Sequence, residues 1–155
     1  MDLLLLLHVL GAILFVGNII MAAFWKVGAD RTGELAVIAK AARGLMRADY
    51  CFTIPGIVLL LASGHAMAHR LGYPLPELSW LGVSYLLFAL SGLIWAAALL
   101  PLQRRMIREA DISVREGRLT AGYRSASARW NAFGTVATLL PLAVLALMVL
   151  KRLPF

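Results

Sequence analysis

Four long apolar stretches alternate with polar segments along this chain. They cover residues 3–25, 50–68, 80–102 and 130–150. At about 1.5 Å per residue, each is long enough for a helix to cross roughly 30 Å of hydrocarbon. The pattern therefore predicts four membrane-spanning helices, and an even number of spans places both termini on the same side.

The connections between the spans carry patterns of their own. In the first connection apolar side chains recur at helical spacing: Leu35, Ile38, Ala42, Leu45 and Met46. This spacing predicts a separate helix or an extension of the second span. The third connection, 103–129, mixes charges of both signs and predicts helical extensions, with the reversal at Gly117 and Gly122. The second, 71–76, is short and rich in turn formers, so spans two and three are expected to be antiparallel neighbours.

Basic residues are concentrated in two of these connections. Five of the fifteen Lys and Arg residues lie in 26–49 and seven in 103–129. By the positive-inside rule both segments are cytoplasmic and both termini face outward, which suits a bacterial inner membrane. The net charge of +7 follows from this topology, so no nucleic-acid partner is expected. Tryptophans at span ends are expected in the interfacial belts: Trp25, Trp80 and Trp130.

Composition agrees with the membrane assignment. The chain is 61% hydrophobic and 15% charged, outside the usual range of soluble domains. A single cysteine, Cys51, excludes an intramolecular disulfide and a thiolate cluster. Asp2 stands where a signal peptide has positive charge, so the first span is expected to be retained. The expected fold is all-α: one integral membrane four-helix bundle over 1–155, with cytoplasmic helical extensions.

A histidine inside the first span, His8, is the first candidate for chemistry, because ionisable groups in hydrocarbon are costly. His65 and Met148 are expected at a similar depth, near the outer ends of the second and fourth spans. Two such ligands in a four-helix bundle suit a haem b. Alternatively, His8 hydrogen-bonds a neighbouring helix, while His65 and His69 are satisfied by interfacial water. Copper is another use of imidazole and thioether ligands.

A second polar cluster is expected near the cytoplasmic ends of the spans. Lys26, Arg124 and Asn131 are candidates to hold haem propionates or an anionic substrate. Lys26 follows His8 by about 27 Å along one helix face, so one haem cannot reach both. The alternative is that the basic residues only set topology and contact lipid phosphates. Prolines within the spans are weak signals, because membrane helices often tolerate them: Pro55, Pro101 and Pro141.

Several segments resemble a bacterial family of small four-span membrane proteins of unknown function. The matching segments are His8-Val-Leu-Gly-Ala, Ala23-Phe-Trp-Lys, Ala29-Asp-Arg-Thr, Ala48-Asp-Tyr-Cys-Phe-Thr-Ile-Pro-Gly, Tyr123-Arg, Trp130, Gly134-Thr and Met148-Val-Leu-Lys. They cover most of the chain. This resemblance implies the four-span fold and carries no known activity with it.

More distantly, the chain is similar to HemJ-type protoporphyrinogen oxidases. The shared features are the histidine early in span one, the basic residue at its inner end, and a last span with matching positions: Tyr123, Arg124, Asn131, Thr138, Pro141, Lys151, Pro154 and Phe155. That resemblance implies haem b bound through His8. Ala132 stands where that family has a glutamate, and the third span lacks its usual Lys and His, which puts the oxidase activity in doubt more than the fold.

Two classes of function follow from these patterns. The first is a haem-b redox protein acting on a porphyrin- or quinone-like substrate, with an unidentified redox partner. The second is a non-enzymatic assembly factor or lipid-interacting protein whose histidines are structural. Small residues on the last span, Gly134, Ala137 and Pro141, are expected to form the contact of a homodimer.

Overall fold

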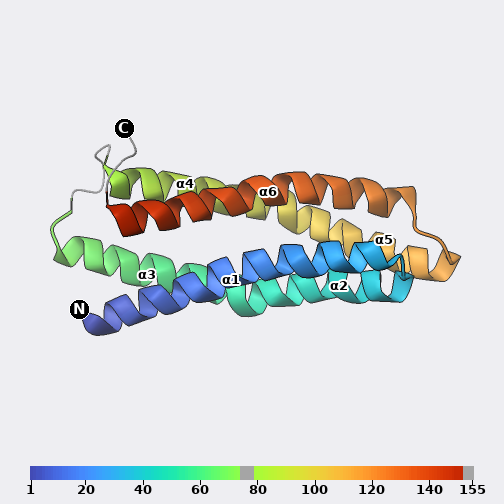
Figure 1. Ribbon diagram of the computed structural model, residues 1–155, viewed down its shortest axis with the longest axis horizontal. Coiled ribbons are helices and arrows are strands. Elements are labelled where there is room, and N and C mark those ends of the chain that lie inside the picture. Colours follow the sequence, from blue (N-terminus) through green and yellow to red (C-terminus); the bar gives the residue numbers. More distant parts are fainter. Residues whose placement is uncertain (74–78, 152–155) are drawn as a thin grey trace.

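Four long helical rods make up the computed structural model, which describes residues 1–73 and 79–151 (Figure 1). The elements are α1 (Asp2–Thr32), α2 (Leu35–Ala48), η1 (Asp49–Thr53), α3 (Ile54–Arg70), α4 (Trp80–Ile94), η2 (Trp95–Leu99), α5 (Leu100–Glu116) and α6 (Ala121–Leu150). The π-helical turns η1 and η2 join their neighbours without a break, so 35–70 and 80–116 are each one continuous helix. The first connection is therefore an extension of the second span, and the all-α prediction is confirmed.

The helices end where the sequence provides caps. Gly33 ends α1 and Gly117 ends α5, each with a positive φ, of 69° and 67°. The Thr120 side chain begins α6 by accepting a hydrogen bond from the Tyr123 backbone N–H. Gly117 thus marks the predicted reversal, whereas Gly122 lies in the first turn of α6 against the Glu109 carboxylate. Part of the predicted turn 71–76 lies outside the described residues.

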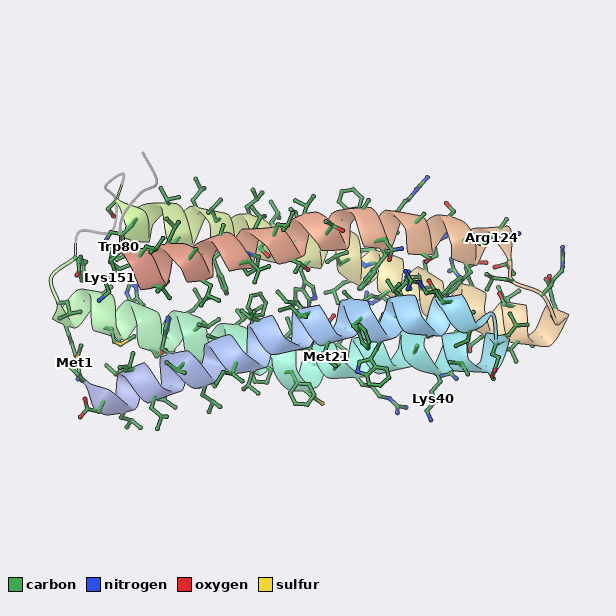
Figure 2. All side chains as sticks on the ribbon, in the orientation of Figure 1. Met1, Met21, Lys40, Trp80, Arg124 and Lys151 are labelled. Carbon is green, nitrogen blue, oxygen red and sulfur yellow. The ribbon has the colours of Figure 1, made fainter. Side chains whose placement is uncertain are left out.

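The four rods form two pairs, α1 with α3 and α4 with α6, and α2 packs against α5 (Figure 1). Met1, Trp80 and Lys151 lie at one end, here called the termini end, while Arg124 lies toward the other, the basic end (Figure 2). Among the described residues α3 and α4 make no close backbone approach. The rods 35–70 and 80–116 are thus antiparallel neighbours through α2 and α5, as predicted for spans two and three, whereas their segments α3 and α4 are not neighbours, because chain order fixes the direction of the rods but not which faces pack.

Two glycines explain why α3 lies on α1. A Cβ added at Gly11 would sit 2.9 Å from the Leu59 Cβ and 2.9 Å from the Leu60 backbone nitrogen. A Cβ at Gly56 would sit 2.9 Å from the Phe15 backbone nitrogen. The two backbones therefore approach at a distance that only glycine permits, as small residues allow between membrane helices.

The contact between α4 and α6 includes a hydrogen bond to a carbonyl that a proline leaves free. Pro141 has no N–H to donate to the Ala137 carbonyl one turn earlier. The Ser91 hydroxyl of α4 donates to that carbonyl instead, at 2.9 Å. Ala137 and Pro141 are buried in this contact within the chain, so they do not supply the exposed dimer face predicted for them, and a homodimer stays a prediction.

The most tightly packed part of the bundle lies toward the basic end. Its core joins α2, α5 and α6 through Ile38, Met106 and Ala126, each at most 1% exposed. The spans, in contrast, expose large apolar side chains, among them Leu3, Ile13, Leu86, Leu139 and Val149. All four rods are long and apolar enough to cross a membrane. The chain is thus an integral membrane four-helix bundle with helical extensions at one end.

Candidate functional site

The two π-helical turns mark the same place in two different rods. Each precedes a proline by the same interval, since Asp49 begins η1 six residues before Pro55 and Trp95 begins η2 six residues before Pro101. The first residues of the two turns meet, because the Trp95 indole Nε1 donates to Asp49 Oδ2 at 3.1 Å. π-Helical turns within α-helices occur frequently at functional sites. The pair therefore draws attention to the residues around Asp49.

Asp49, which directly precedes the second span, is only 6% exposed. Its carboxylate is the centre of a buried polar cluster, here called the Asp49 cluster. Its Oδ1 accepts from the Thr53 hydroxyl at 2.8 Å and from the Asn18 amide at 3.3 Å. Its Oδ2 accepts from Trp95 Nε1 and from Gln103 Nε2, the latter at 2.8 Å. Every neighbour is a donor, and four donors satisfy a carboxylate that has little access to water.

A cavity of about 420 Å³, here called the central cavity, lies beside this cluster. Phe15 and Ile19 of α1 line one side, and Trp130 and Gly134 of α6 line another. Most of the remaining lining is apolar, with polar groups only at a few points, which is typical of small-molecule sites. Phe15 also packs against Phe88 of α4, with ring centroids 5.4 Å apart, and so links the two helix pairs.

Two polar atoms on the lining residues have no partner within the described chain. They are Gln103 Oε1, an acceptor, and Trp130 Nε1, a donor. The two residues are only 3% and 6% exposed. A buried polar group without a hydrogen bond costs about 1–3 kcal/mol.

The prediction of an interfacial position for Trp130 is wrong. Its ring points from α6 into the core of the bundle and is only 6% exposed, so it does not lie on the surface that faces the membrane.

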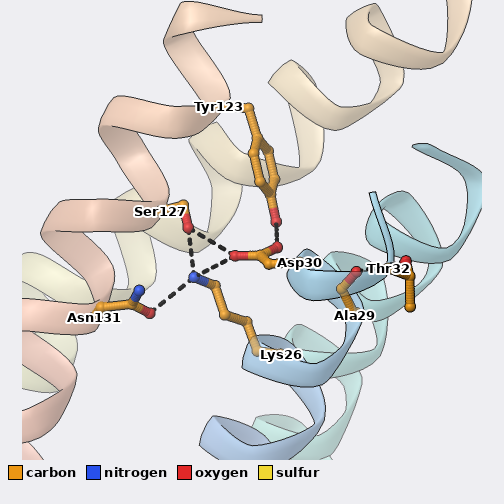
Figure 3. A network of polar contacts seen from close by, with 7 residues as sticks. All are labelled: Lys26, Ala29, Asp30, Thr32, Tyr123, Ser127 and Asn131. Carbon is orange, nitrogen blue, oxygen red and sulfur yellow. Dashed lines mark hydrogen bonds and ion pairs between the residues drawn. The ribbon is translucent and has the colours of Figure 1, made fainter. Parts of the chain in front are cut away.

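A second polar group lies toward the basic end, here called the Lys26 network (Figure 3). Lys26, 1% exposed, donates to Ser127 Oγ at 2.5 Å and to Asn131 Oδ1 at 2.8 Å, and pairs with Asp30 Oδ2 at 2.8 Å. Its ammonium also lies 5.4 Å from the centre of the Trp130 ring. All three N–H groups of Lys26 thus have partners within the chain.

Asp30 extends the Lys26 network toward a smaller cavity of about 270 Å³. Its Oδ1 accepts from the Tyr123 hydroxyl at 2.7 Å. Burial, with the hydrogen bond to Asp30, raises the pKa of Tyr123, which lies in the helical extension outside span 130–150, so this residue is a neutral donor. Arg124 is exposed and lines the small cavity together with Asp30 and Asn131. The structure therefore joins Lys26 to Asn131 by a hydrogen bond and places Asn131 and Arg124 on one small cavity, and the role of the three residues toward an anionic substrate stays a prediction.

His8 lies on the face of α1 that packs against α3. Its Nδ1 is 3.2 Å from both the Leu60 carbonyl and Ser63 Oγ. Gly64 makes room for the ring, since a Cβ there would lie 2.9 Å from His8 Cε1. His65 is exposed and Met148 is half-buried. Haem ligation by these residues stays a prediction, and the central cavity is not lined by any of them.

The sequence pattern groups Asp49 and Gln103 among the polar residues at the cytoplasmic ends of the spans, but it misses the hydrogen bonds of the Asp49 cluster. Asn18 and Trp95 lie within spans, and Gln103 directly follows one. Their sequence separations from Asp49 are 31, 46 and 54 residues, so no local spacing relates them. The available signal was that Asp49 and Trp95 each precede a proline by six residues.

Among the described residues, no group of three or more His, Cys, Asp or Glu is placed to hold a metal ion.

Comparison with known proteins gives one match. The family model described as "Predicted integral membrane protein (DUF2269)" matches residues 2–152. No curated protein and no solved structure matches the chain. The similarity to HemJ-type oxidases is therefore without support from these comparisons, whereas the predicted membership of a four-span membrane family is confirmed. Because the match covers nearly the whole length, this chain belongs to the DUF2269 family of integral membrane proteins.

Proposed function

We propose that this protein binds a lipid-soluble, quinone-like ligand in the central cavity. The ligand has a flat apolar body against Phe15 and Ile19 and a polar head group between Gln103 and Trp130. The observation that carries this proposal is the pair of buried, unpartnered atoms on residues that line one cavity. A head group that both donates and accepts a hydrogen bond satisfies the two atoms together.

The two unpartnered atoms favour a polar head group over a purely apolar ligand. Leaving Gln103 Oε1 and Trp130 Nε1 without partners costs roughly 1–3 kcal/mol for each atom. A purely hydrocarbon ligand would not recover this cost. A head group with a hydroxyl in reach of Gln103 Oε1 and a hydroxyl or carbonyl in reach of Trp130 Nε1 recovers it, and the apolar lining stabilises the rest of the molecule through burial.

Access from the membrane also supports a lipid-soluble ligand. Among the lining residues on α6, Asn131, Thr135 and Leu139 are exposed on the surface of the bundle. They form a rim beside α1, whose Ala23 also lines the cavity. A ligand dissolved in the bilayer therefore reaches the cavity sideways between α1 and α6, without crossing the polar ends of the helices.

Tryptophan fluorescence provides a direct test. A benzoquinone with a decyl tail, added to the protein in mild detergent, is expected to quench Trp95 and Trp130 in a saturable way and to raise the unfolding temperature. Trp130→Phe keeps an aromatic ring and removes the donor, so binding followed by thermal shift is expected to weaken about 10-fold. Trp25→Phe is the matched control, because Trp25 is 64% exposed and does not line the cavity. Absence of saturable binding of both this quinone and the corresponding hydroquinone to the wild type rejects the proposal.

Haem at His8 is a second candidate, favoured by one observation. Ser63 donates its own hydroxyl proton to the Leu59 carbonyl, so both partners of His8 Nδ1 act as acceptors. Nδ1 therefore carries the proton and Nε2 has a free lone pair, the arrangement expected of a metal-binding histidine. A bound haem would supply electron transfer at the termini end, with His65 or Met148 as the candidate second ligand.

Visible spectra separate this candidate from a structural role of the histidines. A Soret band in purified protein, shifted on reduction and lost in His8→Ala, supports haem binding. A preparation that stays colourless after haem addition rejects it and favours the non-enzymatic, lipid-interacting alternative. His69→Ala is the control, because His69 is an exposed histidine at the end of α3.

A further inference from the structure

We propose that Asp49 makes the central cavity selective for ligands whose head group bears a hydroxyl, so that a quinol or phenol binds in preference to the fully oxidised quinone. This inference rests on the proposed function of the cavity and goes beyond it by assigning the chemical form of the ligand. It depends on the orientation of one side-chain amide, that of Gln103.

The neighbours of Asp49 determine that orientation. Trp95 Nε1 can only donate a hydrogen bond, and it donates to Asp49 Oδ2 at 3.1 Å. Oδ2 is therefore an acceptor. Gln103 approaches the same oxygen at 2.8 Å, so it must present its NH₂ group there. Turning the amide over would place two oxygens against each other and leave an acceptor of Asp49 without its donor.

The remaining atom of the amide decides what the ligand must offer. With Nε2 held by Asp49, Gln103 Oε1 is left without a partner in the buried wall beside the cavity. A carbonyl oxygen only accepts, so the ligand atom that meets it must be a donor. Trp130 Nε1 imposes the opposite requirement, since it only donates.

A phenolic hydroxyl within hydrogen-bond distance of both atoms would satisfy both requirements with one group. Its proton would go to Gln103 Oε1 and its oxygen would accept from Trp130 Nε1. A quinone carbonyl satisfies Trp130 but meets Gln103 Oε1 with a second lone pair. Sites built to hydrogen-bond a hydroxyl discriminate strongly against analogues that lack it. We expect the hydroxyl form to bind at least about 10-fold more tightly than the carbonyl form.

Two matched pairs of probes measure this preference. The first is the decyl hydroquinone and the corresponding quinone, compared under anaerobic conditions. The second is para-decylphenol and its methyl ether, which differ in the donor and undergo no redox change. The dissociation constants of all four with the wild-type protein are measured by thermal shift and by competition against tryptophan quenching.

Variants then assign the preference to Gln103 and Asp49. Gln103→Met keeps the volume of the side chain and removes the acceptor, so the phenol preference is expected to fall below about 2-fold. Asp49→Ala removes the acceptor that holds Gln103 Nε2, so the amide is no longer fixed in one orientation, and we expect the preference to fall there as well. Thr138→Val is the control, because Thr138 lines the same cavity without contacting Asp49 in the described hydrogen bonds, and the preference should be retained.

The outcomes separate this inference from the proposed function. If the wild type binds both members of each pair equally, the selectivity is rejected while the binding function stands. If no probe binds, the proposed function is rejected together with the selectivity. If Gln103→Met does not fold, the ratio in Asp49→Ala decides, and an undiminished preference in that variant overturns the role of Asp49.

Discussion

A buried lysine illustrates what individual residues contribute in this bundle. Lys26 has partners for all three N–H groups, and Asp30 provides the compensating charge. Removing one member of a buried ion pair leaves the other without its counter-charge. Because Asp30 is 26% exposed and keeps donors from Tyr123 and Ser127, we expect Lys26→Met to lower the free energy of unfolding by about 2 kcal/mol. Unfolding by denaturing detergent, followed by circular dichroism, measures the loss.

Lys40→Met is the matched control for this change. Lys40 is exposed on α2, so the same substitution is expected to change stability by less than about 0.5 kcal/mol. Equal effects of the two substitutions would mean that the charge of Lys26, like that of Lys40, serves only to orient the protein in the membrane. That result would contradict a structural role for the Lys26 network.

Prediction from sequence worked less well at the residue scale than for the spans. The intramembrane position of His8 and the proximity of Lys26 to Asn131 follow from hydropathy and from helix ends. Gln103 could be grouped with Asp49 by its place at a span end, but the contacts of Asp49 with Asn18 and Trp95 could not be predicted, because they come from different rods and depend on which helix faces meet. Trp130 was misassigned for the same reason: a position near a span end fixes the depth of a side chain but not whether it points toward lipid or toward the core.

At the scale of elements, the contact between α1 and α3 provides a sharp test. We expect Gly11→Ala to destabilise the protein by about 1–3 kcal/mol, because the new methyl group meets the backbone of α3. Gly17→Ala in the same helix meets nothing within 4 Å and is expected to be neutral or to stabilise by up to about 1 kcal/mol. Thermal unfolding in detergent compares the two, and equal effects would contradict the close approach of these helices.

The contact between α4 and α6 leads to a prediction about coupling. Ser91 satisfies the Ala137 carbonyl that Pro141 leaves free, so Ser91→Ala is expected to cost about 1 kcal/mol in the wild type. In a Pro141→Ala background the helix can supply its own N–H, and the cost should fall by about 0.5–1 kcal/mol. A double-mutant cycle on unfolding free energies measures this coupling. Additive effects would show that the serine acts independently of the proline.

At the scale of the whole molecule, the number and direction of the rods follow from hydropathy, because the length of an apolar stretch reflects the thickness of the bilayer. The pairing of α1 with α3 and of α4 with α6 does not follow from it. That pairing depends on a few small residues, such as Gly11 and Gly56, whose effect becomes visible only once the facing helix is known. The π-helical turns were equally hidden, since prolines in membrane helices usually indicate no more than a local kink.

Orientation in the membrane is the remaining property of the whole molecule that charge predicts. The rods place Met1 and Lys151 at one end and most basic residues at the other, so the positive-inside rule predicts that the basic end is cytoplasmic. In a Cys51→Ser background, a cysteine introduced by Asp2→Cys should react with a membrane-impermeant maleimide on intact cells. A cysteine introduced by Arg118→Cys, exposed just after α5, should react only after lysis. The reverse pattern would place the termini in the cytoplasm, and the entry to the small cavity beside Arg124 on the outer side.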